Sequence, residues 1–484
     1  MTTIISTQKV NGWPSICLIL SSVVRFSKAR DTLLACLFFT AAAAFSFITP
    51  PFQAPDEPSH FFRAYQVSEG IFLSHKLNEN IGGELPITIE SSVTPFGNLP
   101  FHSSEKIKVE YFRHTLESAP QLNKNNDRHF VAFPSSAVNS PVPYLPAALA
   151  IAIVRFLGGS VYYAFYAGRF FTVIFVTILL CCSLKALNGD RHFQLGWFTI
   201  AGLPMSVFLT GSLSADALTI GFSLLTIALG ISIQRDSRRG KLFIYLMSAA
   251  ALSLCKSVYG LIGLIALPRI IFDKSREASV KWWAAGYVVC ASLLPGVIWN
   301  ILASHFFVPW RPYTLIDPHL QFLNVLSHPF TVMPALFIDI LKNIPSHVEE
   351  LIGVLGWLDT RLHYVPRLGF ATLLFTTFIF SIKNTGRNEG ETQANQVSAA
   401  VIFFVVSCLI YAAMFLSWTP LNSLHIEGVQ GRYFLPILPL LFTIVRPIKL
   451  KLKYYEIFFT VWIVTWLYFI TRIGKNILDR YWLF

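Results

Sequence analysis

Long apolar stretches recur along almost the whole chain, and they limit what it can fold into. A helix of about 20 apolar residues spans a bilayer. The clear stretches are Leu33–Ile48, Ala164–Leu184, Leu218–Ile233, Trp282–Leu302, Phe370–Ile382, Ala399–Leu416 and Ile457–Ile470. Further candidates are Tyr144–Leu157, Phe193–Thr210, Leu242–Leu254, Leu261–Ile271 and Tyr433–Val445. Soluble domains carry about 25% charged residues, whereas this 484-residue chain has 13%. We therefore predict an all-α polytopic membrane protein with about ten to twelve transmembrane helices.

Basic residues cluster in short segments between these stretches, and short basic loops stay in the cytoplasm. The clusters are Arg25–Arg30, Arg235–Lys241, Lys274–Lys281, Lys383–Arg387 and Arg446–Lys453. The net charge of +12 therefore indicates membrane topology rather than nucleic-acid binding. We predict a multi-pass protein of the bacterial inner membrane whose long polar segments face the periplasm.

This pattern predicts an order of segments along the chain. They are a cytoplasmic N-terminus that includes a candidate interfacial helix (1–32), a first transmembrane helix (33–51), a large periplasmic loop (52–143), transmembrane helices (144–304), a second periplasmic loop (305–367) and C-terminal transmembrane helices (368–484). Three apolar segments between residues 143 and 213 conflict with an outward Asp216. Either one of them does not cross the membrane, with the short Tyr144–Leu157 as first candidate, or a further crossing is hidden.

Cysteine and histidine patterns favour neither a disulfide framework nor a metal centre. Each of the 7 cysteines lies in or beside an apolar stretch, and the chain has no CxxC, HExxH or P-loop motif. We predict no metal and no cofactor.

The acidic pair Asp56-Glu57 follows the first apolar helix directly. Ionisable groups at a membrane boundary indicate function by default, and a carboxylate there can act as a general base towards an acceptor hydroxyl. A structural alternative is that one of the pair caps a helix that begins near Pro58. His60 and Arg63, one turn further on, could orient the carboxylate or meet a phosphate.

Further polar residues interrupt apolar sequence on the side predicted to face outward. Lys256, with Tyr259 three residues on, could contact a lipid phosphate or snorkel to the surface. Asp216 could act at the site or cap the next helix. Arg432 stands at the start of an apolar segment, where a guanidinium could hold phosphate or anchor the segment in the interface. Trp357, close to Asp359, could stack on a sugar or end an outer helix.

These stretches resemble the DUF2142 family of bacterial membrane proteins. They are Pro55–Phe61 with Arg63-Ala64-Tyr65, Ser214–Ala217, Lys256–Tyr259, Gly353–Asp359 and Gly428–Pro439. The family is similar to GT-C glycosyltransferases, and the layout is also similar to phage serotype-converting O-antigen glucosyltransferases. The resemblance implies a GT-C-like fold, with Asp56 as the catalytic carboxylate and Glu57 as its neighbour or substitute. Lys256, Arg432 and Arg63 would bind the donor phosphate. The residues expected to bind substrate are His60, Asp216, Tyr259, Trp357, Asp359, Gln430 and Tyr433.

We therefore expect an inverting glycosyltransferase that uses a polyprenyl-phosphate sugar, with glucose as the expected sugar. Its acceptor would be a hydroxyl of O-antigen or another lipid-linked or surface glycan. The alternatives are a lipid-linked sugar flippase and an O-antigen polymerase or ligase. Transporters favour internal repeats and midplane polar sites, whereas here the polar clusters gather on one predicted face.

Overall fold

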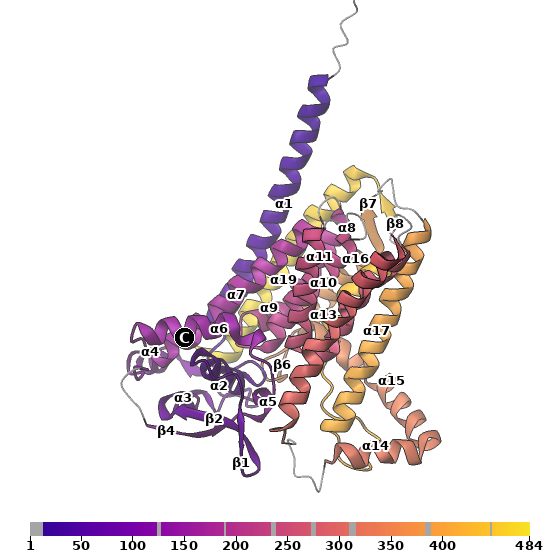
Figure 1. Ribbon diagram of the computed structural model, residues 1–484. Coiled ribbons are helices and arrows are strands. Elements are labelled where there is room, and N and C mark those ends of the chain that lie inside the picture. The colour runs from indigo at the N-terminus through magenta and orange to yellow at the C-terminus, as the bar shows by residue number, and fades with distance from the viewer. Residues whose placement is uncertain are drawn as a thin grey trace, which may run out of the picture.

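The computed structural model describes residues 13–122, 127–187, 190–233, 239–272, 277–308, 316–382, 389–445 and 448–484. Its main body is a bundle of long helices (Figure 1). By length and composition, the candidate membrane spans lie in α1 (Trp13–Ile48), α7 (Val161–Ala186), α10 (Ala215–Ile233), α13 (Ala278–Ser304), α17 (Glu389–Ser417) and α19 (Leu452–Tyr481). The predicted class, a mostly helical multi-pass membrane protein, is confirmed.

The predicted number of ten to twelve spans is not confirmed. In the part of the chain described here, 6 helices pass the test, or up to 8 if each bent pair is one span. The pairs are α8 (Arg191–Ala201) with α9 (Pro204–Thr210), bent by 66°, and α14 (Pro318–Ser327) with α15 (Pro329–Gly353), bent by 112°. Each second helix begins at a proline, which lacks the N–H that would continue the preceding helix. The segment 305–367, expected to be a loop, is thus largely helical.

Several predicted spans are shorter or less regular than their hydropathy suggests. The short apolar helices are α6 (Leu145–Phe156), α11 (Arg239–Cys255), η3 (Ser257–Ala266) with α12 (Leu267–Phe272), and α16 (Tyr364–Ile379). With 12 residues, α6 is about 18 Å long, less than the bilayer core of about 30 Å, so it is too short to cross. The stretch Tyr433–Val445 contains two prolines and forms η4 (Gly431–Phe434), η5 (Leu438–Leu440) and α18 (Leu441–Ile444) instead of one helix.

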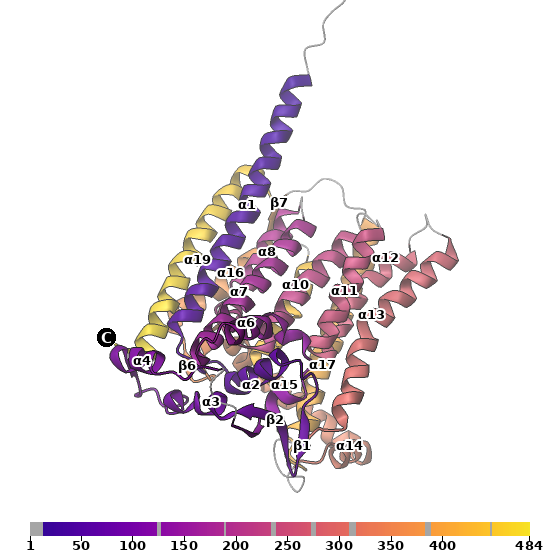
Figure 2. The same ribbon diagram turned by 60° about the vertical axis from the view of Figure 1, so that its left-hand side comes forward.

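A small mixed subdomain covers the lower end of the bundle in Figures 1 and 2. It contains α2 (Glu57–Ser68), β1 (His75–Leu77), β2 (Asn80–Pro86), α3 (Ile87–Ser91), β3 (Ile107–Lys108), α4 (Val109–Glu117), β4 (Arg128–Ala132) and α5 (Pro134–Ala137). The strands β1, β2 and β4 form an antiparallel sheet, in which Gly82 pairs with Ala132 and Pro86 with Arg128. The helix expected to begin near Pro58 is α2, which starts at Glu57 and ends at Ser68.

The end of α19 is tied to this subdomain. Residues Trp482–Leu483 form β9, which pairs in parallel with β3, so that Ile107 lies opposite Trp482. The indole Nε1 of Trp482 donates to the Ile48 carbonyl at 2.6 Å, at the end of α1. In both ribbon views α1 and α19 run side by side (Figures 1 and 2).

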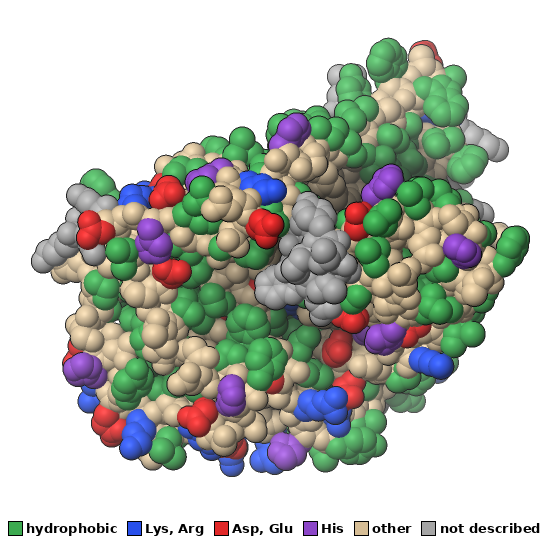
Figure 3. Space-filling view, turned by 90° about the horizontal axis from the view of Figure 1, so that it is seen from below, with side chains coloured by type: hydrophobic (Ala, Val, Ile, Leu, Met, Phe, Trp, Pro, Cys, Tyr) green, Lys and Arg blue, Asp and Glu red, His purple; other side chains and the backbone are tan. Residues whose placement is uncertain are grey.

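The upper end of the bundle carries the short parallel pair β7 (Phe380–Ile382) and β8 (Ile448–Leu450) (Figure 1). Of the basic clusters predicted to be cytoplasmic, Arg25–Arg30 lies in α1, Lys383–Arg387 lies outside the described residues, and the other three lie partly outside them, at 234–238, 273–276 and 446–447. Figure 3 looks onto the opposite, lower end, where acidic, basic and histidine side chains spread over the surface.

Candidate active site

Asp56 sits directly before α2 in a left-handed backbone conformation, with φ of 58° and ψ of 14°. Aspartate tolerates this region better than most residues. Its side chain makes no capping hydrogen bond to the helix, so the alternative in which Asp56 serves as a cap is not observed. The side chain is 40% exposed. Asp56 therefore presents a carboxylate at the positive end of a helix, open to an incoming molecule.

Four charged side chains from separate parts of the chain meet at this point: Asp56, Asp216, Lys256 and Arg432, which we call the charge cluster. The Lys256 Nζ lies 2.5 Å from Asp216 Oδ1. Arg432 reaches both carboxylates, with Nη2 at 3.4 Å from Asp56 Oδ2 and Nε at 3.5 Å from Asp216 Oδ2. The sequence predicted that these four residues lie on one face of the membrane, and the structure brings them together.

Neither structural alternative for Asp216 and Lys256 matches the contacts. Ser214, not Asp216, caps the start of α10, because its Oγ accepts the Asp216 backbone N–H at 3.2 Å. Lys256 points to a carboxylate rather than only to solvent, and its side chain is 29% exposed. Both residues are therefore available to the charge cluster.

Arg432 is the most enclosed member of the cluster, with its side chain 4% exposed. Its Nε and Nη1 atoms are buried and make no hydrogen bond, although Nε faces Asp216. Buried donors are normally satisfied, and unpaired ones cost about 1–3 kcal/mol each. An anion that accepted from these N–H groups would remove that cost, so Arg432 is suited to a phosphate.

Tyr433 and Tyr259 line the same place. The Lys256 Nζ lies 4.9 Å from the centre of the Tyr433 ring, and the Arg432 guanidinium carbon lies 5.5 Å from it. The Tyr259 hydroxyl donates to the Tyr433 carbonyl at 2.7 Å, which fixes the backbone next to Arg432. Gln430, two residues before Arg432, has a buried Oε1 without a hydrogen-bond partner.

His60 lies beneath Asp56 as a buried side chain. Its Nδ1 is 2.7 Å from the Tyr144 hydroxyl, which also accepts from Asn139 Nδ2 at 2.9 Å. Burial lowers the pKa of His60 to about 4, against the opposing effect of Asp56 and Asp216. His60 is therefore neutral at pH 7 and supports the α2 start through Tyr144 rather than by its charge.

The low pKa of His60 predicts how the free energy of unfolding changes as the pH falls. The folded protein disfavours protonated His60, so the unfolded state binds more protons between the unfolded pKa of about 6.5 and the folded value of about 4. His60 should therefore cost up to about 3 kcal/mol of stability as the pH falls through this window. Thermal unfolding in detergent from pH 7 to 4 should show a smaller loss for His60→Gln than for the wild type. Equal losses would contradict the assignment.

Glu57, expected to be a neighbour or substitute for Asp56, turns away from the charge cluster. It forms a bidentate pair with Arg169, with Nη2 to Oε2 at 2.7 Å and Nε to Oε1 at 2.8 Å, and both side chains are 0% exposed. The carboxylate also accepts the backbone N–H groups of Leu213 at 2.9 Å and Ala54 at 3.3 Å. These bonds leave Glu57 no open face for a substrate, and they give it a structural role.

Arg63, predicted to bind phosphate, is likewise committed to the protein. Its Nη2 donates to the carbonyls of Phe72 at 2.7 Å and Asn139 at 3.0 Å, and its Nη1 contacts Gln66 and Ser74. It is buried and makes no ion pair with the charge cluster. Arg63 thus holds the segment after α2 rather than a ligand.

Trp357 and Asp359 hold a turn together. The Trp357 Nε1 donates to the Phe52 carbonyl at 2.9 Å, and its ring centre lies 6.0 Å from that of Phe101. Asp359 accepts the Phe101 N–H at 2.8 Å and lies 3.3 Å from Arg480 Nη2. The Asp359 carboxylate is therefore used by the fold, which leaves the exposed Phe101 ring and the partly exposed Trp357 ring at the surface.

Glu350 and His347, near the end of α15, were not among the predicted site residues. Glu350 Oε2 accepts the Gly431 N–H at 2.7 Å, immediately before Arg432, and His347 Nδ1 lies 3.5 Å from the same carboxylate. A Cβ on Gly431 would lie 2.1 Å from the His347 carbonyl oxygen, so only glycine permits this approach. The available signal was the i, i+3 pair of ionisable residues in the last two turns of the helix.

Glu350 should act on Arg432 through the backbone. A hydrogen bond to a charged acceptor contributes about 1.5–3 kcal/mol, so, if the site binds an anionic substrate, Glu350→Ala should raise its KM by roughly tenfold or more with a smaller change in kcat. Glu350→Gln keeps an acceptor oxygen and should retain most of the affinity. The neighbouring Glu349→Gln, which touches Arg367 instead, is the matched control in steady-state kinetics. A kcat loss in Glu350→Ala without a KM change would contradict this role.

No cluster of three or more histidine, cysteine, aspartate or glutamate side chains suited to a metal ion occurs among the described residues. Arg432 lies beside the exposed Asp56 carboxylate, and both Arg432 and Lys256 contact Asp216.

Comparisons with known proteins give one family match. The model of a family described as predicted membrane protein (DUF2142) matches residues 37–441. This range contains every member of the charge cluster. No curated protein and no solved structure matches the chain.

Proposed function

The chain belongs to the DUF2142 family of predicted membrane proteins, and on that premise we propose that it is an inverting glycosyltransferase of GT-C type. Its donor would be a polyprenyl-phosphate sugar, with glucose as the first sugar to test. Its acceptor would be a hydroxyl of O-antigen or another lipid-linked or surface glycan. The reaction would take place on the periplasmic face of the bacterial inner membrane.

One observation carries the proposal: a buried, incompletely bonded guanidinium lies next to an exposed carboxylate. Arg432 has unpaired N–H donors at 4% exposure, and its Nη2 lies 3.4 Å from the 40% exposed Asp56. Sugar transfer from a lipid phosphate needs both groups at one site, because the donor phosphate must be held while the acceptor hydroxyl loses its proton.

The proposed step balances without a cofactor. The acceptor hydroxyl oxygen attacks the anomeric carbon from the face opposite the phosphate, and its proton passes to Asp56. The bond between the anomeric carbon and the phosphate oxygen breaks, and polyprenyl phosphate leaves with the bonding electrons. Arg432 and Lys256 stabilise the charge that grows on the phosphate, as preorganised donors do in other enzymes.

Asp216 would pair with the two cations when no donor is bound. Its carboxylate lies against both Lys256 and Arg432, so the two cations stay near an anion when no donor is bound. Removal of either partner of such a pair leaves an uncompensated charge, which is costly. We propose that Asp216 positions the cations and that the donor phosphate takes up the free N–H groups of Arg432.

The deciding experiment is transfer of labelled glucose from synthetic polyprenyl-phosphate glucose to isolated lipopolysaccharide by the purified protein. Glucose incorporation with release of polyprenyl phosphate would support the proposal. If a panel of polyprenyl-phosphate sugars and glycan acceptors gives no transfer while the protein moves the intact donor across liposomes, the proposal is wrong and a flippase takes its place.

A further inference from the structure

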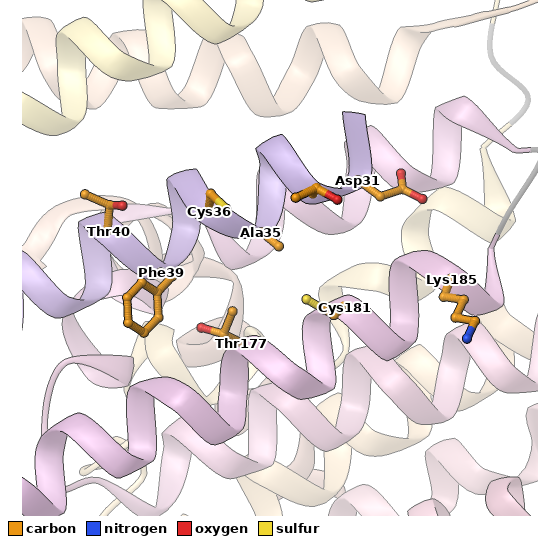
Figure 4. A pocket seen from close by; sticks show the side chains of 9 residues that line it. Asp31, Ala35, Cys36, Phe39, Thr40, Thr177, Cys181 and Lys185 are labelled. Carbon is orange, nitrogen blue, oxygen red and sulfur yellow. The ribbon is translucent and has the colours of Figure 1, made fainter. Parts of the chain in front are cut away.

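A groove of about 650 Å³ runs between the middle of α1 and the C-terminal part of α7, away from the charge cluster. In Figure 4, Asp31, Cys36 and Phe39 line it from α1, and Thr177, Cys181 and Lys185 line it from α7. Its volume is within the range of about 300–1,000 Å³ that small-molecule sites occupy.

Most of the groove is apolar and opens to the outside of the bundle. Cys36, Thr40 and Cys181 are exposed along it, and Phe39 lines the end nearer Ile48. Because α1 and α7 are candidate spans, this opening faces the hydrocarbon of the bilayer. A lipid chain is the material that fills such a space.

One end of the groove carries two charges of opposite sign, Asp31 and Lys185 (Figure 4). Asp31 Oδ2 accepts from Gln194 Nε2 at 3.1 Å, whereas Oδ1 is buried without a hydrogen-bond partner. Within the described residues, neither Asp31 nor Lys185 forms a salt bridge. Arg30, the neighbour of Asp31 in the chain, forms its salt bridge with Glu456 at 2.8 Å, and so does Arg191 at 2.5 Å.

Ionisable groups at membrane depth are costly unless they have a partner. The two charges at the groove's end match a headgroup that offers an ammonium to Asp31 and a phosphate to Lys185. An anionic headgroup would leave Asp31 uncompensated. A quaternary ammonium has no N–H to donate to the free oxygen, whereas a primary ammonium has three.

We propose that this groove binds a phospholipid of the phosphatidylethanolamine class, with its ammonium on Asp31, its phosphate on Lys185 and an acyl chain along Cys36 and Cys181. The site differs from the one proposed for the glycosyl donor. Asp31 and Ile48 are 17 residues apart on α1, about 26 Å at 1.5 Å per residue, which places the headgroup near the opposite membrane surface. The inference therefore stands independently of the proposed function.

The test measures which lipid remains bound to purified protein. The full chain is incubated in detergent with phosphatidylethanolamine, phosphatidylglycerol and phosphatidylcholine of identical acyl chains, and the adducts are counted by native mass spectrometry. The wild type should prefer phosphatidylethanolamine over each competitor by about tenfold, as a charge-assisted hydrogen bond would give. Asp31→Asn should abolish the preference over phosphatidylcholine, and Lys185→Gln should weaken retention of both zwitterionic lipids. Lys281→Gln, at the start of α13, is the matched control.

A further variant distinguishes loss of lipid binding from loss of folding. Cys181→Trp fills the exposed middle of the groove and keeps both charged residues, so it should lose bound lipid while its melting temperature is unchanged. Equal retention of the three lipids by the wild type would overturn the proposal. So would an unaltered phosphatidylethanolamine preference in folded Asp31→Asn.

Discussion

Asp56→Asn should abolish sugar transfer, with kcat reduced by about 10²–10⁴-fold, the contribution typical of general base catalysis. Among the carboxylates of the charge cluster, Asp56 is 40% exposed while Asp216 is 11% exposed, so Asp56 is the one that an acceptor hydroxyl can reach. Asparagine has the same shape and tolerates the left-handed backbone, but its amide cannot take up the proton. Because the Asp56 side chain does not cap α2, folding should be intact.

The measurement is labelled-sugar transfer under donor saturation, alongside thermal unfolding of the same preparations. Glu90→Gln is the matched control, since it neutralises an exposed carboxylate of the same subdomain that lies 2.5 Å from His129. Its kcat should equal that of the wild type. If Asp56→Asn retained turnover, Asp56 would not be the general base. The melting curve of the same variant would reveal any loss of folding.

Glu57→Gln should destabilise the protein by about 3–5 kcal/mol, as expected when one partner of a buried ion pair is removed. Arg169 would keep its charge at 0% exposure. The destabilisation would extend beyond the ion pair. Arg169 also donates to the carbonyls of Ser46 at 2.8 Å, Thr49 at 2.7 Å and Pro50 at 3.1 Å. These carbonyls are at the end of α1, where the chain leaves the bundle and turns towards Asp56.

Thermal unfolding in detergent measures this effect, and the readout is the monodisperse peak that the protein retains after heating. Arg128→Gln is the comparison, since it breaks a partly exposed pair with Glu69 whose contribution should be about 0–1 kcal/mol. The double variant Glu57→Gln with Arg169→Met should recover part of the loss, because it leaves no uncompensated charge. If Glu57→Gln were as mild as Arg128→Gln, the buried pair would not stabilise the fold.

The sequence predicted the membrane class and the grouping of the charge cluster because both follow from where residues fall in the hydropathy pattern. Asp56, Asp216, Lys256 and Arg432 each stand at the edge of an apolar stretch, and the basic segments assign these edges to one face. The pattern did not predict the number of spans. Hydropathy averages across Pro204 and Pro329, so it does not separate a continuous helix from a broken one.

The choice between Asp56 and Glu57 needed the structure. Both are carboxylates beside the same proline-rich turn, and their roles differ only through partners distant in sequence. The partner of Glu57 is Arg169, 112 residues further on. A lone arginine inside the apolar stretch Ala164–Leu184 was the one available sign of a buried anion. Glu350 was missed for the same reason, since its contact with Gly431 crosses 81 residues.

The pairing of β3 with β9 has a consequence for how the protein is made. Arg480 donates to the Glu105 carbonyl, 375 residues earlier in the chain, and Trp482 joins the end of α1. The subdomain that carries Asp56 is synthesised early, yet these contacts become available only after α19 has been inserted. Until then its edge strand at residues 107–108 stays unpaired. Insertion of α19 is therefore coupled to completion of the subdomain that carries Asp56.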